Sequence, residues 1–162
     1  MSSTQAEVTD PACPPSLAVY NTRFLSLSNS PEQREQWKKK IANVRHLVKQ
    51  CDVVCVLETH VEGVTAEMFF GCNIDGTCRH YDHDIAVFIN EKLHEVHKPR
   101  FEIIIPSVMV ALSWHDRGCR HWAIFFRLDA HLEATRLEQL RCGTRWASQN
   151  VDASDFVAFL GD

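Results

Sequence analysis

The stretch CDVVCVLETH, Cys51 to His60, decides how the chain is expected to fold. Its centre, Val53 to Leu57, is an apolar run rich in valine, which is typical of a parallel strand covered on both faces. The polar residues Glu58, Thr59 and His60 follow at once. Because ligands of open α/β sheets bind beyond the carboxyl ends of the strands, Glu58 is the first candidate functional residue.

The segment before this strand begins with a strong helix signal. Ser30 is placed to act as the N-cap, Pro31 stands at the first helical position and Gln33 can close a capping box. Apolar residues then recur at helical spacing, which predicts a helix over residues 31 to 50.

A second strand is expected at Leu17 to Tyr20, and Asn21 stands at its end. With the helix between them, residues 17 to 58 are predicted to form a βαβ unit with a right-handed crossover. The carboxyl ends of its two parallel strands lie at one edge of the sheet. Asn21 and Glu58 are therefore expected to lie side by side.

The rest of the chain alternates β-rich runs with turn-like segments, and the short connections predict antiparallel neighbours. Expected loops are Gly71 to His83, Asn90 to Pro99 and His115 to Arg120. Helices are expected at Val64 to Phe70 and Ala130 to Trp146. Strands are expected at Ile85 to Ile89, Phe101 to Ile105, Val108 to Trp114, Trp122 to Arg127 and, as a last buried strand, Phe156 to Leu160.

The composition is that of one globular domain. The chain has 162 residues, of which 45% are hydrophobic and 23% are charged, and its formal net charge is -4. This charge gives no global attraction to nucleic acid or anionic membranes, and no apolar run approaches the ~20 residues that span a bilayer. Residues 1 to 16 are polar and proline-bearing, and we expect a flexible tail there. The odd number of cysteines, 7, predicts reduced thiols and an intracellular location.

Four blocks of the sequence resemble the endonuclease/exonuclease/phosphatase superfamily, with the retroelement and apurinic-type endonucleases most similar. The blocks are VYN (19 to 21), VVCVLETH (53 to 60), IAVFIN (85 to 90) and FVAFLGD (156 to 162). The resemblance implies an α/β (α+β) fold, a two-layer β-sandwich flanked by helices. Residues 17 to 162 would be the N-terminal part of such a domain, incomplete at its C-terminus.

The resemblance also implies a site. Asn21 and Glu58 would hold Mg²⁺ (or Mn²⁺) beside a scissile phosphate of DNA or another phosphodiester, and Asp162 would activate or position the attacking water. A hard cation with oxygen ligands and water suits a single glutamate beside an amide. Arg127 stands where the family usually offers tyrosine or histidine. The block LDAH, from Leu128 to His131, leaves sphingomyelinase-like or inositol-phosphatase-like substrates open.

Two family features have no counterpart in these 162 residues: the asparagine of the GDxN motif and a later Asp-His pair. Since acid-base assistance alone is worth ~10² to 10⁴ in rate, we expect little or no hydrolase activity from this polypeptide. Apolar surface along Phe156 to Leu160 and Trp122 to Phe126 is expected to be exposed and to favour self-association. A non-catalytic binding or interaction remnant is the alternative.

One further cluster, Cys72, Cys78, His80 and His83, contains residue types that bind zinc. Its spacing matches no structural zinc pattern. His60 either faces the same cleft as Glu58 or lines a loop without a catalytic role.

Overall fold

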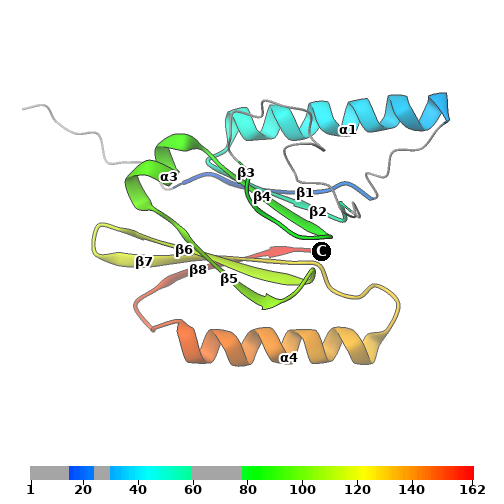
Figure 1. The fold of residues 1–162 in the computed structure, drawn as a ribbon. Coiled ribbons are helices and arrows are strands. Elements are labelled where there is room, and N and C mark those ends of the chain that lie inside the picture. The colour runs from blue at the N-terminus through cyan, green and yellow to red at the C-terminus, as the bar shows by residue number, and fades with distance from the viewer. Residues whose placement is uncertain (1–14, 24–29, 60–77) are drawn as a thin grey trace, which may run out of the picture.

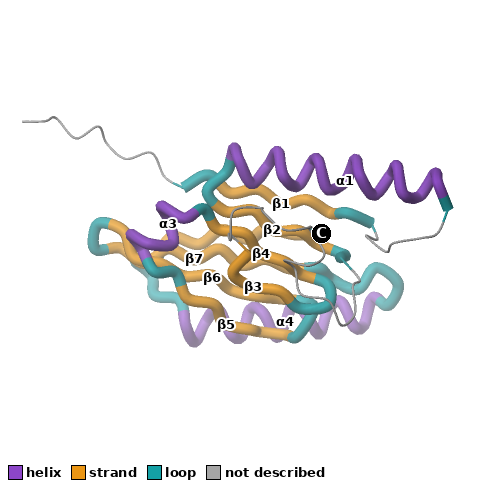
Figure 2. Tube along the Cα trace, turned by 45° about the horizontal axis from the view of Figure 1, so that its top comes forward, coloured by secondary structure: helices purple, strands orange, loops and turns teal. Residues whose placement is uncertain are grey.

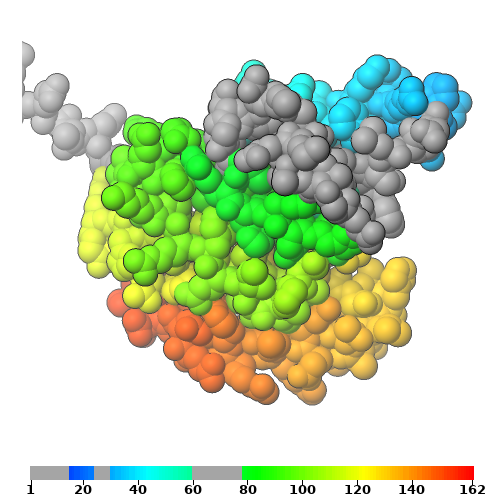
Figure 3. Space-filling model, in the orientation of Figure 1, coloured from blue at the N-terminus to red at the C-terminus, as the bar shows by residue number. Residues whose placement is uncertain are grey.

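The computed structural model describes residues 15–23, 30–59 and 78–162, which form four layers (Figure 1). Two four-stranded sheets pack face to face, with helix α1 (Pro31–Gln50) on the outer face of one and helix α4 (Glu133–Asn150) on the outer face of the other (Figure 2). In the space-filling view these helices form the upper and lower surfaces (Figure 3). The predicted sandwich flanked by helices is confirmed.

The first sheet contains the predicted βαβ unit. Its strand order is β1-β2-β4-β3, with β1 parallel to β2 and the other neighbours antiparallel. Ser30 caps α1 as predicted, because its side chain accepts a hydrogen bond from the Gln33 backbone N–H. The strands are β1 (Leu17–Asn21), β2 (Val53–Leu57), β3 (Cys78–Tyr81) and β4 (Ile85–Ile89).

The second sheet has the order β5-β6-β7-β8, and only β7 and β8, which α4 connects, are parallel. β6 and β7 extend further than predicted and are joined by Arg117 and Gly118. Both residues have positive φ, 50° and 81°, as in the two-residue turns that match the twist of a hairpin. The strands are β5 (Arg100–Ile105), β6 (Met109–Asp116), β7 (Cys119–Phe126) and β8 (Phe156–Gly161).

Alternation along each strand divides the core into three layers. In β2, Val53, Cys55 and Leu57 face the second sheet, whereas Val54 and Val56 pack under α1. In β7, Ala123 and Phe125 lie between the sheets in the same way, whereas Trp122 and Ile124 pack under α4. Both central strands are thus covered on both faces, which explains their apolar sequences.

All three expected loops contain regular structure: β6 and β7 extend into the one from 115 to 120, and the other two contain a helix and a strand. Helix α3 (Glu91–His97) replaces part of the expected loop from 90 to 99, because Asn90 accepts a hydrogen bond from Leu93 N at 2.7 Å and Leu93 is buried. Strand β3 lies within the expected loop from 71 to 83. This strand is stabilised by pairing with β4, a contact distant in sequence that its polar residues CRHY do not reveal.

The last strand differs from the prediction in its burial. Phe156 and Phe159 are 62% and 59% exposed, since β8 is an edge strand paired with β7 alone. The expected exposure of this strand is therefore confirmed, and its description as buried is wrong. Exposure of Trp122 to Phe126 was also wrongly expected, because Trp122 to Phe125 are buried between two neighbouring strands.

Some predictions concern residues outside the described ranges: the N-terminal tail up to residue 14, His60, Cys72 and the helix from 64 to 70. Among the residues that the structure does describe, no helix is long and apolar enough to cross a membrane.

Candidate functional site

Three of the predicted site residues meet at one end of the sandwich. Asn21, the last residue of β1, is in register with Leu57, and Glu58 follows directly. Asp162 follows β8 in the second sheet, and the Asn21 side-chain Nδ2 donates a hydrogen bond to Asp162 Oδ2 at 2.6 Å. The structure therefore brings Asn21, Glu58 and Asp162 together from two sheets. Their assignment as metal ligands and catalytic groups remains a prediction.

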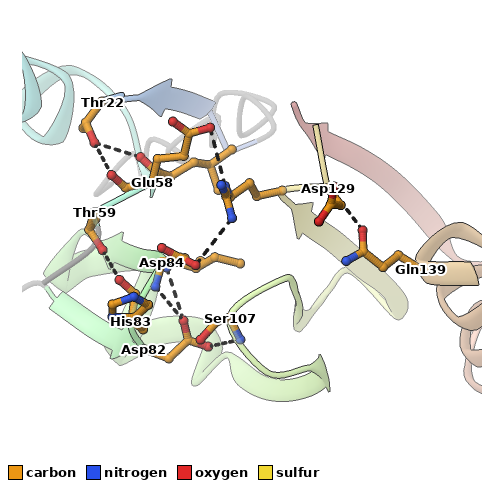
Figure 4. A network of polar contacts seen from close by, with 12 residues as sticks. Thr22, Glu58, Thr59, Asp82, His83, Asp84, Ser107, Asp129 and Gln139 are labelled. Carbon is orange, nitrogen blue, oxygen red and sulfur yellow. Dashed lines mark hydrogen bonds and ion pairs between the residues drawn. The ribbon is translucent and has the colours of Figure 1, made fainter. Parts of the chain in front are cut away.

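The backbone at Glu58 is held in an uncommon conformation. Its φ is 58°, in the left-handed region that a glutamate seldom adopts. The buried Thr22 hydroxyl lies 2.9 Å from the carbonyl oxygens of Leu57 and Glu58, to which it donates (Figure 4). On the other side, Thr59 Oγ1 donates to the His83 carbonyl at 2.8 Å. A strained backbone conformation of this kind persists only where several neighbouring contacts hold it, and such positions are frequent at functional sites.

Arg127 lies at the centre of the charged groups. Its Nε is 3.4 Å from Glu58 Oε1 and its Nη1 is 3.5 Å from Asp84 Oδ2 (Figure 4). The three side chains are largely shielded, with exposed fractions of 27%, 20% and 10% for Arg127, Glu58 and Asp84. Both distances exceed those of close N–H···O hydrogen bonds. The guanidinium is therefore held by charge between two carboxylates without a bidentate contact.

Asp82 supports Asp84 and links the two sheets. Its Oδ1 accepts hydrogen bonds from the backbone N–H groups of Asp84 and Ile85, and its Oδ2 accepts one from Ser107 N at 2.9 Å (Figure 4). Burial acts to raise the pKa of Asp82, but the nearby His80 ring, whose Nε2 lies 3.8 Å from Oδ2, and the three backbone hydrogen bonds bring that pKa below its ordinary value. Asp82 is thus ionised at neutral pH and fixes the start of β4.

The LDAH block has a structural role at the start of α4. Asp129 Oδ1 accepts hydrogen bonds from the backbone N–H groups of His131 and Leu132. The Asp129 N–H donates to Gln139 Oε1 (Figure 4). The bonds from Leu132 and His131 lower the pKa of the Asp129 carboxyl. Asp129 therefore holds the turn that precedes α4, and its carboxylate is occupied by backbone groups.

The oxygen donors at this end of the sandwich fit a hydrated magnesium ion. Glu58 supplies a carboxylate and Asn21 an amide oxygen, and Mg²⁺ commonly takes one or two protein ligands with water and phosphate. Asn21 Oδ1 already accepts a hydrogen bond from Arg23 N at 2.9 Å, which fixes the amide orientation. Among the described residues no group of three or more histidine, cysteine or acidic side chains is placed to hold a metal. A cation here would depend on Glu58 and would compete with Arg127.

Sequence reasoning missed Thr22, Asp82 and Asp84. Asp84 immediately precedes β4, and β4 runs antiparallel to β2, so its first residues lie at the edge where β2 ends. A prediction of that pairing would have placed Asp84 beside Glu58. Thr22 gave no comparable signal, because its role depends on the backbone conformation of Glu58.

Comparisons of the whole chain with known proteins find similarity in structure alone. No known protein family matches the sequence, and no curated protein matches it. A TDP2 from D. rerio, humanised by 14 mutations, is similar with a TM-score of 0.61 at 12% identity, over 91% of this chain and 61% of that one.

Two further structures agree with this match. The endonuclease domain of TRAS1, a telomere-specific non-LTR retrotransposon, has a TM-score of 0.52 at 12% identity, over 92% of this chain and 60% of its own. An endonuclease/exonuclease/phosphatase family protein from Leptotrichia buccalis has a TM-score of 0.52 at 12% identity, over 91% and 65%.

Fold and site together define a class of α/β protein with two sheets between helices and polar groups at the ends of β1, β2 and β8. The chain has the endonuclease/exonuclease/phosphatase fold, as the sequence resemblance implied, and spans about three fifths of the length of the first structures it matches.

Proposed function

We propose that these residues form the metal-binding part of a Mg²⁺-dependent phosphodiester hydrolase site, with little or no hydrolysis by the 162-residue chain. The observation that carries this proposal is the meeting of Asn21, Glu58 and Asp162 at one end of the sandwich. Each of these residues follows or ends a different strand, so the fold and not local sequence assembles the group.

Each side chain has a chemical task in this proposal. Glu58 and Asn21 hold the cation, which when bound would polarise a phosphoryl oxygen and offset negative charge. Asp162 is oriented by its hydrogen bond to Asn21 and accepts a proton from, or positions, an attacking water. Arg127 offers a guanidinium to phosphate oxygens, a pairing that its planar donors suit.

DNA is the favoured substrate class, and other phosphodiesters are the alternative. The similar TRAS1 structure is that of an endonuclease domain, which supports DNA as the substrate class. Low activity is proposed for these 162 residues alone, because the family resemblance implies an asparagine and an Asp-His pair that they do not include.

Metal titration tests the site directly. Mn²⁺ binding to the wild-type chain, followed by electron paramagnetic resonance or calorimetry, should weaken at least tenfold in Glu58→Gln, since the substitution removes a charged oxygen ligand. The matched control is Glu95→Gln on α3, which changes an exposed glutamate and should bind as wild type does. Equal affinity of the wild-type chain and Glu58→Gln would contradict the proposed metal site.

Hydrolysis is a separate measurement. We expect no release of product above background from abasic or supercoiled DNA, or from a phosphodiester model substrate, with Mg²⁺ present. Turnover that Glu58→Gln abolishes would contradict the proposed inactivity while supporting the site.

Replacing Arg127 should strengthen metal binding. A guanidinium 3.4 Å from Glu58 Oε1 repels a cation bound to the same carboxylate, and such repulsion is worth ~1–4 kcal/mol at the dielectric of a partly shielded site. Arg127→Gln is therefore expected to raise Mn²⁺ affinity roughly tenfold, whereas Arg145→Gln on α4, an exposed arginine, leaves it unchanged. An unchanged or weaker affinity in Arg127→Gln would show that Arg127 does not compete with the metal.

A second candidate function, a non-catalytic interaction module, is favoured by the open edge of β8. Phe156 and Phe159 are more than half exposed there, and an apolar edge strand is a template for pairing with a second copy. Sedimentation over a wide range of protein concentrations tests this candidate. A chain that binds Mn²⁺ through Glu58 and stays monomeric would exclude it.

A further inference from the structure

A second polar site lies at the opposite end of the sandwich from Glu58. It is a pocket of about 360 Å³, lined by the end of α3 and by the adjoining parts of β5, β6 and β7. Figure 1 shows the β6–β7 hairpin on the side away from the C-terminus. Arg120 in this pocket and Arg127 are seven positions apart, about 23 Å along an extended strand. The pocket is therefore a separate site.

The walls of the pocket carry an excess of positive charge. Lys98, Arg100 and Arg120 line it, together with a single acid, Glu102. Throughout the described parts of the chain, none of these three cations forms an ion pair. The neighbouring Asp155 accepts hydrogen bonds from Trp122 Nε1 and Asp152 N through the same oxygen. Even with both acids counted, three positive charges face two negative ones.

Arg120 is oriented by two contacts with residues of its own sheet. Its guanidinium carbon lies 5.7 Å from the ring centroid of Trp122, over the ring, and Trp122 is only 3% exposed. Its Nε donates to His115 Nε2 at 3.4 Å. Stacking and this hydrogen bond use the face and the inner edge of the guanidinium. Among the described residues, the two terminal nitrogens form no hydrogen bond or ion pair, so they can donate to an oxyanion.

The opposite wall is also positioned. His97 Nδ1 lies 2.8 Å from the His115 carbonyl oxygen, which ties the end of α3 to β6. Lys98 follows in the left-handed conformation that ends α3. Arg100 is in register with Ser113, and Ser113 with Trp122, so Arg100 projects from the same face of the sheet as the Arg120–Trp122 pair. Cations from three elements thus converge on one space.

We propose that this pocket binds the phosphate group of a small molecule. Two guanidinium groups and an ammonium suit the charge and the several oxygens of a phosphate better than a single carboxylate. The volume lies within the range of small-molecule pockets and exceeds what a bare phosphate fills. This site needs neither a metal nor Glu58.

Binding is tested with inorganic phosphate and with adenosine 5′-monophosphate, at low ionic strength and with a chelator present. Quenching of tryptophan fluorescence or calorimetry gives the affinity. We expect saturable binding that weakens roughly tenfold in Arg120→Gln and in Arg100→Gln. Arg145→Gln removes the same charge from the exposed side of α4 and should bind as wild type does. Tighter binding of the nucleotide identifies an organic phosphate, and equal binding identifies recognition of the phosphate alone.

Two results would overturn this proposal: no saturable binding of either probe, or equal loss of affinity in Arg120→Gln and Arg145→Gln. Circular dichroism of each variant checks that it folds, and two independent pocket substitutions guard against failure of one. The pocket shares no residue with the site at Glu58, and the chelator removes any metal there. The outcome therefore does not depend on the proposed hydrolase site.

Discussion

Gly161→Ala is expected to destabilise the chain by about 2–4 kcal/mol and to separate Asp162 from Asn21. A methyl group at Gly161 would lie 2.1 Å from the Phe126 carbonyl oxygen and 2.5 Å from Phe126 Cδ2. The carbonyl belongs to the backbone of the paired strand β7, so β8 must move. The movement breaks the bonds from Asp162 N to Phe126 O and from Leu128 N to Asp162 O.

Thermal unfolding and hydrogen exchange measure this effect. The midpoint should fall by roughly 5–10 °C, and the Leu128 amide should exchange faster because its acceptor is lost. Gly143→Ala is a closely matched control. Its added methyl would also be too close, but to the Met109 Sδ and Cε atoms at 2.7 and 2.8 Å, and this flexible side chain can turn away. Similar midpoints for the two variants would show that backbone approach at Gly161 is not what positions Asp162.

Local sequence was sufficient for the elements with a strong periodic or capping signal. The Ser30-Pro31 start predicted α1 at its observed bounds, and the run from Val53 to Leu57 predicted β2 without error. The parallel pairing of β1 and β2 followed from the helix between them. For these elements the local preference and the final packing agree, because β2 is buried on both faces and β1 is partly buried on both.

Local sequence failed where a distant contact stabilises the element. β3 has polar residues, and its strand conformation depends on β4 and on stacking of His80 with Phe101 of the opposite sheet, with ring centroids 5.2 Å apart. The same limit applies to the site. Asn21 and Glu58 could be placed together from topology, but the ion pairs of Arg127 required knowledge of how the two sheets face each other.

Asp82→Ala should be the most damaging single change among the polar residues near the site, at about 2–4 kcal/mol of unfolding free energy. The carboxylate accepts three partly buried backbone hydrogen bonds, and a shielded donor left without a partner costs about 1–3 kcal/mol. Asp82→Asn separates the two contributions. Its remaining carbonyl oxygen can replace Oδ1 toward Asp84 and Ile85, whereas its amide nitrogen cannot accept from Ser107 N. Asp82→Asn should therefore lose only the hydrogen bond from Ser107 N, which links the two sheets, and should be destabilised less than Asp82→Ala.

Acid provides an independent test of Asp82. Its folded pKa lies below the ordinary 3.8, so the carboxylate contributes stability that is fully present above that value and is lost as pH falls through the folded pKa. In urea unfolding, the free energy of unfolding of the wild type should exceed that of Asp82→Ala by a constant amount near neutral pH. This difference should shrink below about pH 4. Asp152→Ala, at an exposed aspartate after α4, should change stability by no more than about 0.5 kcal/mol. Protonation removes the charge-assisted hydrogen bonds but leaves the Asp82 side chain in place. If the difference in unfolding free energy between wild type and Asp82→Ala is as large at pH 2–3 as at neutral pH, the lost stability comes from packing and not from the ionised carboxylate.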